Sequence, residues 1–268
     1  MRQIFPVGGR ADLGRAELLS AAGPITSASA GVDGLIAALG EIYAYPEGRW
    51  VRANMIASVD GAIMVDGKSG GLSGPADRLV FRVLRSLSDV IVVGAGTARA
   101  ERYRQAQPGE LWQQLRTGRP PTPPIVVLTR HLDLDLDLTS RLFGDVGLAQ
   151  TILITTEQAP QERLQAAAQV ADVVVAGAAE VSAAAAINVL EQRGYQRILV
   201  EGGPTLLGHF TAADLLDELC LTISPVLEGG HSPGRLTRAA LDPAKLAGLR
   251  LAGVLEDDGF LLTRYVRA

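Results

Sequence analysis

From residue 50 onward, the chain alternates short aliphatic and β-branched runs with segments whose apolar residues recur at helical spacing. The runs include IVVLT at 125–129, TILIT at 151–155 and DVVVA at 172–176. Strands that are apolar throughout are typical of sheets buried on both faces, and the segments between them supply the covering helices. The pattern therefore predicts an α/β fold with a mostly parallel sheet.

The same periodicities predict where the elements lie. Strands are expected at residues 51–59, 89–93, 125–129, 151–155, 172–176 and 197–200, and helices at residues 33–43, 77–87, 161–169 and 181–193. Three further runs, at 217–225, 249–255 and 260–266, follow one another without long helices. They are expected to pair antiparallel at an edge of the sheet, which makes the sheet mixed.

The chain divides by composition as well as by pattern. Residues 1–48 are rich in Ala, Gly and Ser, and we expect them to form an N-terminal extension that packs on a main domain of residues 49–268. Residues 104–124 and 229–242 are loop-rich and long enough to form walls of a site. The LDLDLDL run at 132–138 is interpreted as a solvated edge rather than a metal site.

Composition and charge exclude several classes of protein. Hydrophobic residues make up 47% of the 268 residues, and 25 Lys and Arg stand against 29 Asp and Glu. This balance lacks the broad positive field of non-specific nucleic-acid binding. The first residues lack the apolar core of a secretion signal, and charges interrupt every long apolar stretch. We expect a cytoplasmic protein that contacts neither nucleic acid nor membrane.

The residues that commonly bind metals are few. The single cysteine, Cys220, lies in an apolar run, so it forms no internal disulfide and is interpreted as a small core residue. His131, His209 and His231 are widely spaced and have no partner motif. No metal site is expected.

A glycine-rich turn follows the expected strand at 197–200. Glu201 is followed by Gly202 and Gly203, and then by Pro204, which suits the first position of a helix. The glycines permit close backbone approach, and a helix N-terminus attracts an anion such as a pyrophosphate. An ordinary strand-to-helix turn explains the glycines equally well. A carboxylate such as that of Glu201 at a strand's carboxyl end commonly faces the ligand crevice.

Three other strand ends carry candidate residues. Gly94 and Gly96 form a second glycine turn, and two such turns at one sheet edge can flank a dinucleotide. Thr129 and Arg130 end a third strand, where a hydroxyl and a guanidinium suit the extra phosphate of NADP. A structural turn and a surface arginine are the alternatives. Asp60 follows the first strand, either in a hairpin turn or beside the crevice.

The ordered series of these motifs resembles a known family. ASVDG at 57–61, SGGLSG at 69–74, DVIVVGAGT at 89–97 and EGG at 201–203 stand in the order and spacing of the reductase domain of riboflavin-biosynthesis deaminase/reductase proteins. The resemblance covers about residues 50–268 and is greatest to stand-alone actinobacterial pyrimidine-reductase-like members. Each motif alone is weak, whereas the ordered series is specific.

The resemblance implies a dihydrofolate-reductase-like fold, a homodimer and NADPH as cofactor. The implied reaction reduces 5-amino-6-(5-phosphoribosylamino)uracil to its ribitylamino counterpart, with the hydride delivered to ribose C1′. The expected cofactor contacts are Ala57, Gly71, Gly94, Gly96, Thr97, Glu101, Thr129, Arg130, Gly202, Gly203, Pro204, Thr205, Leu206 and Leu207. The expected substrate contacts are Ser69, Arg85, Glu201 and Asn54. Either Glu201 or Asp60 is expected to handle the proton.

The chain departs from the family pattern at several positions. It has no zinc deaminase signature. Asn54 stands where the family often has lysine, Glu101-Arg102-Tyr103 replaces an acidic-acidic-proline run, and Gly71 lacks the usual aromatic side chain. These changes reshape the substrate pocket. Two alternatives therefore stay open: a paralogue that reduces a dihydropterin or dihydrofolate-like ring, and a catalytically silent NADP(H)-binding protein.

Overall fold

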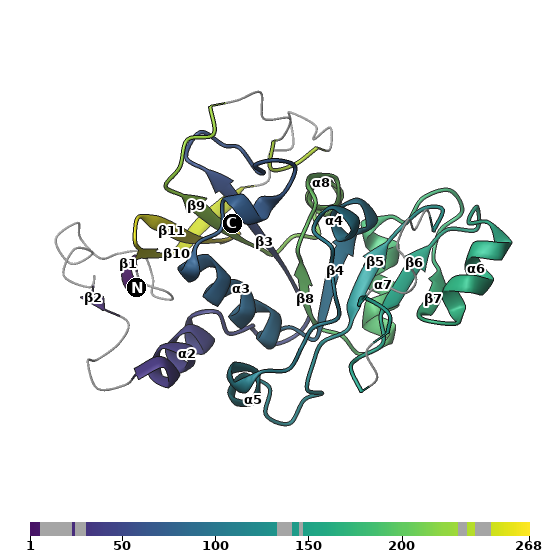
Figure 1. The fold of residues 1–268 in the computed structure, drawn as a ribbon, viewed down its shortest axis with the longest axis horizontal. Helices are drawn as coiled ribbons and strands as arrows, with labels where there is room; N and C mark the ends of the chain where they lie inside the picture. The colour runs from purple at the N-terminus through teal and green to yellow at the C-terminus, as the bar shows by residue number, and fades with distance from the viewer. Residues whose placement is uncertain (6–22, 25–30, 133–140, 145–146, 230–234, 239–247) are drawn as a thin grey trace.

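The computed structural model describes residues 1–5, 23–24, 31–132, 141–144, 147–229, 235–238 and 248–268. Their strands form one eleven-stranded sheet in the order β2-β1-β10-β11-β9-β3-β8-β4-β5-β6-β7, which runs across the molecule in Figure 1. The strands are β1 (Arg2–Phe5), β2 (Gly23–Pro24), β3 (Trp50–Ser58), β4 (Val90–Gly94), β5 (Ile125–Leu128), β6 (Ile152–Thr155), β7 (Asp172–Val175), β8 (Arg197–Val200), β9 (Glu218–Ser224), β10 (Leu249–Asp257) and β11 (Phe260–Arg267).

Helices cover both faces of this sheet. They are α2 (Gly31–Ile42), α3 (Pro75–Leu87), α4 (Ala95–Ala100), α5 (Glu110–Leu115), α6 (Gln161–Ala168), α7 (Ala183–Gln192) and α8 (Pro204–Ala212), with a 3₁₀ turn, η1, at Ser69–Gly71. Alternate residues of β4 show the two faces: Ile91 and Val93 pack in one cluster with α2 and α3, and Val90 and Val92 in another with α7 and α8. This arrangement confirms the expected α/β class.

The sheet is parallel from β9 to β7 and antiparallel beyond β9. β3 pairs parallel with both β8 and β9, whereas β11 pairs antiparallel with β9 and with β10. The antiparallel C-terminal strands are therefore confirmed. They do not form the edge, because β1 pairs with β10 and β2 pairs with β1. No pattern in the sequence indicated these two short strands. The division between residues 1–48 and 49–268 stays a prediction.

Two helices were not expected. α4 begins directly at the Gly94 turn, and α5 lies within the stretch at 104–124 that we predicted to be loop. Both have six residues, too few to show a helical period clearly, and α5 packs against α2 and α3. Of the LDLDLDL run only Leu132 is among the described residues, and it is buried. No helix in the described part of the chain has the length and apolarity needed to cross a membrane.

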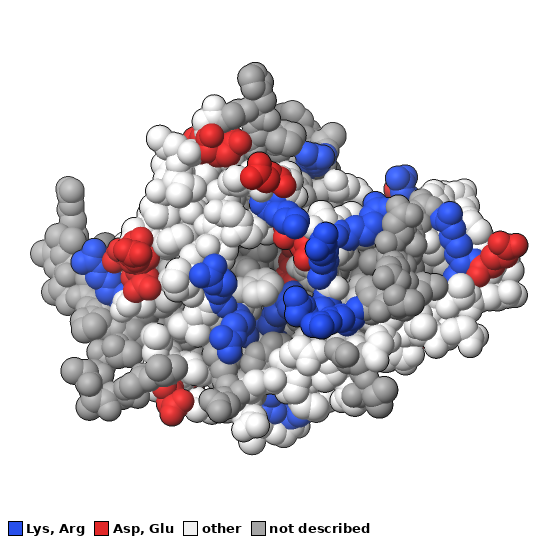
Figure 2. Space-filling model, in the orientation of Figure 1, with Lys and Arg blue, Asp and Glu red and all other residues white. Residues whose placement is uncertain are grey.

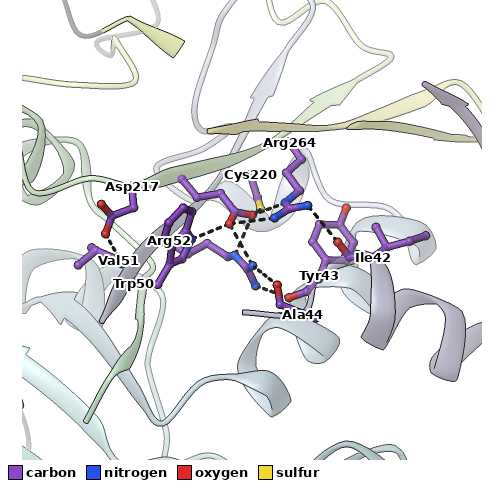
Figure 3. A network of polar contacts seen from close by, with 10 residues as sticks. Ile42, Tyr43, Ala44, Trp50, Val51, Arg52, Asp217, Cys220 and Arg264 are labelled. Atoms are coloured by element: carbon purple, nitrogen blue, oxygen red, sulfur yellow. Dashed lines mark hydrogen bonds and ion pairs between the residues drawn. The ribbon is translucent and has the colours of Figure 1, made fainter. Parts of the chain in front are cut away.

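A buried ionic network joins α2 to the middle of the sheet (Figure 3). Arg52 of β3 and Glu218 of β9 are both fully buried, 2.9 Å apart, and Arg264 of β11 donates to Glu218 at 2.7 Å. The two guanidiniums also donate to the carbonyls of Ile42, Tyr43 and Ala44 at the end of α2. Burial raises the pKa of Cys220, whose thiol lies 3.5 Å from Glu218. Each buried charge is thus paired, as burial requires.

Candidate active site

A cavity of about 560 Å³ lies at the carboxyl ends of β3, β4 and β8. β3 pairs with β8 only through Trp50–Ala53, so its next residues run past the end of β8 and line the cavity with Asn54, Met55 and Ile56. Ligands of open α/β sheets bind at this end of the strands. Figure 2 shows basic side chains gathered around the middle of this face, with acidic side chains deeper between them.

Glu201 and Arg85 form the charged centre of the cavity. Glu201 follows β8, its side chain is 2% exposed, and Arg85 reaches it from the last turn of α3. The contact is bidentate: Nε of Arg85 donates to Oε1 at 2.6 Å, and Nη2 donates to Oε2 at 2.6 Å. Burial opposes the charge on Arg85, but Glu201 outweighs it and raises the pKa of the guanidinium. The bidentate contact therefore favours the charged form of the Arg85 guanidinium.

Two aromatic rings flank this ion pair. The guanidinium of Arg85 lies 4.3 Å from the ring centroid of Phe81 and 5.3 Å from that of Tyr103. The hydroxyl of Tyr103 donates to Oε2 of Glu201 at 2.7 Å. Burial and the nearby charge of Glu201 raise the pKa of Tyr103 well above its ordinary value of 10.0, so its hydroxyl keeps its proton. The rings add cation–π contacts to the base of the cavity.

The two glycine turns meet beside the cavity. The N–H of Gly94 donates to the carbonyl of Gly202 at 3.0 Å, which joins the turn after β4 to the turn after β8. A Cβ at Gly203 would lie 2.5 Å from Oγ1 of Thr97, so any larger residue there would require the Thr97 side chain or the turn to shift. Gly202 has φ +85, a left-handed conformation that favours glycine. α8 starts here, and the first N–H groups of a helix have no partner within it.

A second acid, Glu101, holds the wall of the cavity opposite Glu201. Oε1 of Glu101, at the end of α4, accepts the backbone N–H of Ser69 at 2.7 Å. This bond joins the η1 turn to α4 across the cavity. Arg78, Arg102 and Arg104 are exposed side chains that also line the cavity, and Arg78 donates to the carbonyl of Ser73 at 3.2 Å. The entrance is therefore rich in cations, while the base holds the Glu201 carboxylate.

The structure places nine of the nineteen expected site residues around the cavity. Those that line the cavity are Asn54, Ser69, Arg85, Gly96, Thr97, Glu101, Glu201, Gly203 and Pro204. Thr129 and Arg130 lie past the end of β5, two strands from β8, with Thr129 buried and Arg130 exposed. The side chains of Leu206 and Leu207 pack in the core beneath α8, and the N–H of Leu207 donates to the carbonyl of Gly203 at 3.0 Å.

Asp60 lies apart from this group. It is absent from the described residues that line the cavity, and its carboxylate instead accepts from the hydroxyl of Ser58 and from the N–H groups of Glu228 and Gly229. Those bonds lower the pKa of Asp60 to about 2. The geometry therefore makes Asp60 the anchor of the loop after β9, with no proton to offer near neutral pH.

Several residues of the cavity were not predicted from the sequence. Phe81, Arg102, Tyr103 and Arg104 line it, and none of them had been given a role. Arg102 and Tyr103 belong to the run that departs from the family pattern, and Arg104 begins the loop-rich stretch expected to form a wall. Phe81 and Arg85 stand four residues apart on α3, which places both on one helix face and was a usable signal. The sequence marked Tyr103 as a departure from the family pattern but did not indicate its contact with Glu201, because Arg102, with φ 50, turns the chain sharply after α4. Among the described residues, no His, Cys, Asp and Glu side chains gather as a metal site.

The amino-acid sequence is similar to those of proteins with known names. The chain is 32% identical over 185 residues to the 2,5-diamino-6-ribosylamino-4(3H)-pyrimidinone 5′-phosphate reductase of Archaeoglobus fulgidus, covering 68% of this chain and 83% of that protein. It is 30% identical over 175 residues to the riboflavin biosynthesis protein RibD of Mycobacterium tuberculosis, covering 65% of this chain and 41% of that protein.

The fold is similar to that of solved structures. A pyrimidine reductase-like protein from Corynebacterium diphtheriae superposes with a TM-score of 0.76 at 28% identity, covering 86% of this chain and 98% of that one. The family profile of the RibD C-terminal domain matches residues 49–259, a stretch that contains the whole cavity. The chain therefore belongs to the RibD C-terminal domain family.

Proposed function

We propose that this protein is an NADPH-dependent reductase of 5-amino-6-(5-phosphoribosylamino)uracil, with hydride delivery to ribose C1′ in riboflavin biosynthesis. The names of the relatives support an oxidoreductase that acts on a ribosylaminopyrimidine phosphate. The observation that carries the proposal is the buried Glu201–Arg85 pair, which stands directly beside the two joined glycine turns. One cavity thus offers a dinucleotide cradle, formed by the two glycine turns and the start of α8, and a charged substrate end, formed by Glu201 and Arg85.

The cradle fits a dinucleotide. Two features suit a pyrophosphate: the space at Gly203 that a Cβ would fill against Thr97, and the N-terminus of α8. The pyrophosphate oxygens would accept hydrogen bonds from backbone N–H groups. Thr129 and Arg130 lie along the same edge of the sheet and would hold the 2′-phosphate that distinguishes NADPH from NADH. Bound there, the cofactor supplies the hydride. The chain's part is to hold the nicotinamide against the cavity formed by Asn54, Thr97 and Glu201.

The substrate end fits a polar, cationic centre joined to a phosphate. Ring opening of the ribosylamine leaves an imine-like C1′, and the ionised Glu201 stabilises the positive charge that develops there. Arg78, Arg102 and Arg104 at the entrance suit the 5′-phosphate. Ser69 and Asn54 line the walls between these two regions. Between the two candidate proton carriers, the geometry favours Glu201, because Asp60 points into the loop after β9.

A second substrate is favoured by the names of the relatives. Three are named for 2,5-diamino-6-ribosylamino-4(3H)-pyrimidinone 5′-phosphate, which carries an amino group where the uracil substrate carries a carbonyl. Both compounds present the same ribosylamine and phosphate to Glu201 and to the arginines.

The family resemblance also supports a homodimer, which sedimentation equilibrium of the purified chain tests.

The test is a turnover assay with purified protein and NADPH, followed by the loss of NADPH absorbance. Parallel reactions contain the uracil substrate, the diaminopyrimidinone substrate and dihydrofolate, each with NADPH and with NADH. We expect reduction of a ribosylaminopyrimidine phosphate with NADPH, and the faster substrate identifies the order of deamination and reduction. Turnover of dihydrofolate alone would establish the paralogue instead. Tight NADPH binding with no turnover of any substrate would establish the silent binding protein.

A further inference from the structure

Tyr103 stands in the run that departs from the family pattern, and the motifs assigned it no role. Its backbone N–H donates to the carbonyl of Ala98 at 2.9 Å, which folds the chain back over the end of α4. Arg102, with φ 50, makes this reversal and turns the ring of Tyr103 toward Arg85. The result is a phenol whose hydroxyl reaches Oε2 of Glu201 at 2.7 Å. Local turn geometry therefore places this side chain against the charged centre.

The hydrogen bonds make the two oxygens of Glu201 unequal. A carboxylate oxygen has about two lone-pair positions that accept hydrogen bonds. Among the described residues, Oε2 accepts from both Nη2 of Arg85 and the hydroxyl of Tyr103, whereas Oε1 accepts only from Nε of Arg85. One acceptor position is thus left on Oε1, and Glu201 lines the cavity.

The other charged groups around Glu201 do not compete for that position. Arg85 already uses two nitrogens on the carboxylate. Glu101 accepts from Ser69, and Asp77 of α3 accepts from the hydroxyl of Ser73 at 2.5 Å. Arg78, Arg102 and Arg104 are exposed toward the entrance. The remaining position on Oε1 therefore suits a donor brought by a ligand.

We propose that Tyr103 is a positioning residue that occupies Oε2 of Glu201 and so reserves Oε1 for an N–H donor of the substrate. This inference rests on the proposed function and deepens it, since the nitrogen attached to ribose C1′ is such a donor. Tyr103 also remains a donor throughout the neutral range, because burial and Glu201 raise its pKa well above 10.0. It therefore holds the carboxylate without exchanging protons with the substrate.

The first test is steady-state kinetics of Tyr103→Phe, which keeps the ring against Arg85 and removes only the hydroxyl. We expect kcat to fall about tenfold, the loss typical of one hydrogen bond to a charged group. The KM for the pyrimidine phosphate and the dissociation constant for NADPH should change less than about twofold. Tyr45→Phe is the matched control, since the hydroxyl of Tyr45 has no hydrogen-bond partner among the described residues and lies outside this cavity. An unchanged kcat in Tyr103→Phe, or an equal loss in Tyr45→Phe, overturns the inference.

The second test needs no turnover. The chain has five tyrosines, so the ionisation of Tyr103 is isolated by subtracting the ultraviolet titration of Tyr103→Phe from that of the wild type. We expect no ionisation of Tyr103 near pH 10, and its ionisation should move to lower pH when Glu201→Gln is compared with Glu201→Gln/Tyr103→Phe. If Tyr103 titrates near pH 10 in the wild type, or does not respond to Glu201→Gln, it does not hold that carboxylate. A wild type that reduces neither pyrimidine overturns the proposed function, and this titration still decides whether Tyr103 holds Glu201.

Discussion

Arg85 and Glu201 stand 116 positions apart in the chain and meet through two parallel hydrogen bonds of 2.6 Å. Arg85 lies in the last turn of a helix on one face of the sheet, and Glu201 follows a central strand. With side chains 15% and 2% exposed, the pair is shielded from water, so the two charges depend on each other. The ion pair that would bind substrate thus also ties α3 to the carboxyl end of β8.

Removal of the arginine should leave a buried charge without its main partner. We expect Arg85→Met to lower the free energy of unfolding by about 3 kcal/mol, the lower end for a broken buried pair, because Tyr103 still donates to Glu201. Urea denaturation measures the change. Arg82→Met, at an exposed position of the same helix, should change it by less than about 0.5 kcal/mol. Adding Glu201→Gln should recover part of the stability of Arg85→Met, and a further loss in the double variant would contradict the pairing.

A methyl group at the joined glycine turns should weaken binding of the cofactor. We expect Gly203→Ala to reduce NADPH affinity at least about tenfold, because the new Cβ would lie 2.5 Å from Oγ1 of Thr97 and force the turns apart. Fluorescence titration of NADPH gives the dissociation constants. Gly109→Ala serves as the control, since a Cβ there meets nothing within 4 Å. Equal affinity in wild type and Gly203→Ala would remove this turn from the cofactor site.

The buried network should make stability depend on pH through Glu218. Burial alone would raise its pKa, but Arg52 and Arg264 outweigh burial and lower it. A carboxyl whose pKa is lowered on folding contributes stability above its unfolded pKa of about 4.3, and this contribution is lost as the pH falls through the folded pKa.

We therefore expect Glu218→Gln to cost about 3 to 5 kcal/mol at pH 7, because it leaves the buried guanidinium of Arg52 and the partly buried one of Arg264 without their carboxylate. The difference from wild type should narrow as the pH falls below about 4. Denaturation at a series of pH values measures it, with Glu41→Gln on the exposed face of α2 as control. A difference that is constant with pH would mean that the charge of Glu218 contributes nothing.

Kinetics should distinguish Glu201 from Asp60 as the residue that handles the proton. We expect Glu201→Gln to lower kcat at least about 100-fold, the usual contribution of a positioned acid or base. Asp60→Asn should retain kcat within about threefold from pH 5 to 9, because the pKa of about 2 keeps Asp60 ionised over that range. The pH dependence of kcat for both variants provides the measurement. A loss in Asp60→Asn as large as that in Glu201→Gln would return Asp60 to the reaction.

The accuracy of the sequence predictions varied with how local each feature is. The apolar runs at β4, β5 and β8 were recognised because a strand buried on both faces is apolar at every position. β1 and β2 were missed, since neither the RQIF segment of β1 nor the GP segment of β2 is apolar throughout. The place of β1 is decided by pairing with β10, a partner about 250 positions away, and that of β2 by pairing with β1.

The sequence by itself determined the α/β class, the glycine turns after β4 and β8, and the presence of Glu201 at a strand end, because each depends on residues close together in the chain. Only the tertiary structure decided that Arg85 and Tyr103 share the Glu201 carboxylate and that Asp60 turns away from it. Those outcomes depend on strand order and on the sharp turn at Arg102, which bring distant side chains together. The spacing of residues along a chain does not encode such contacts, since they arise when packed elements meet.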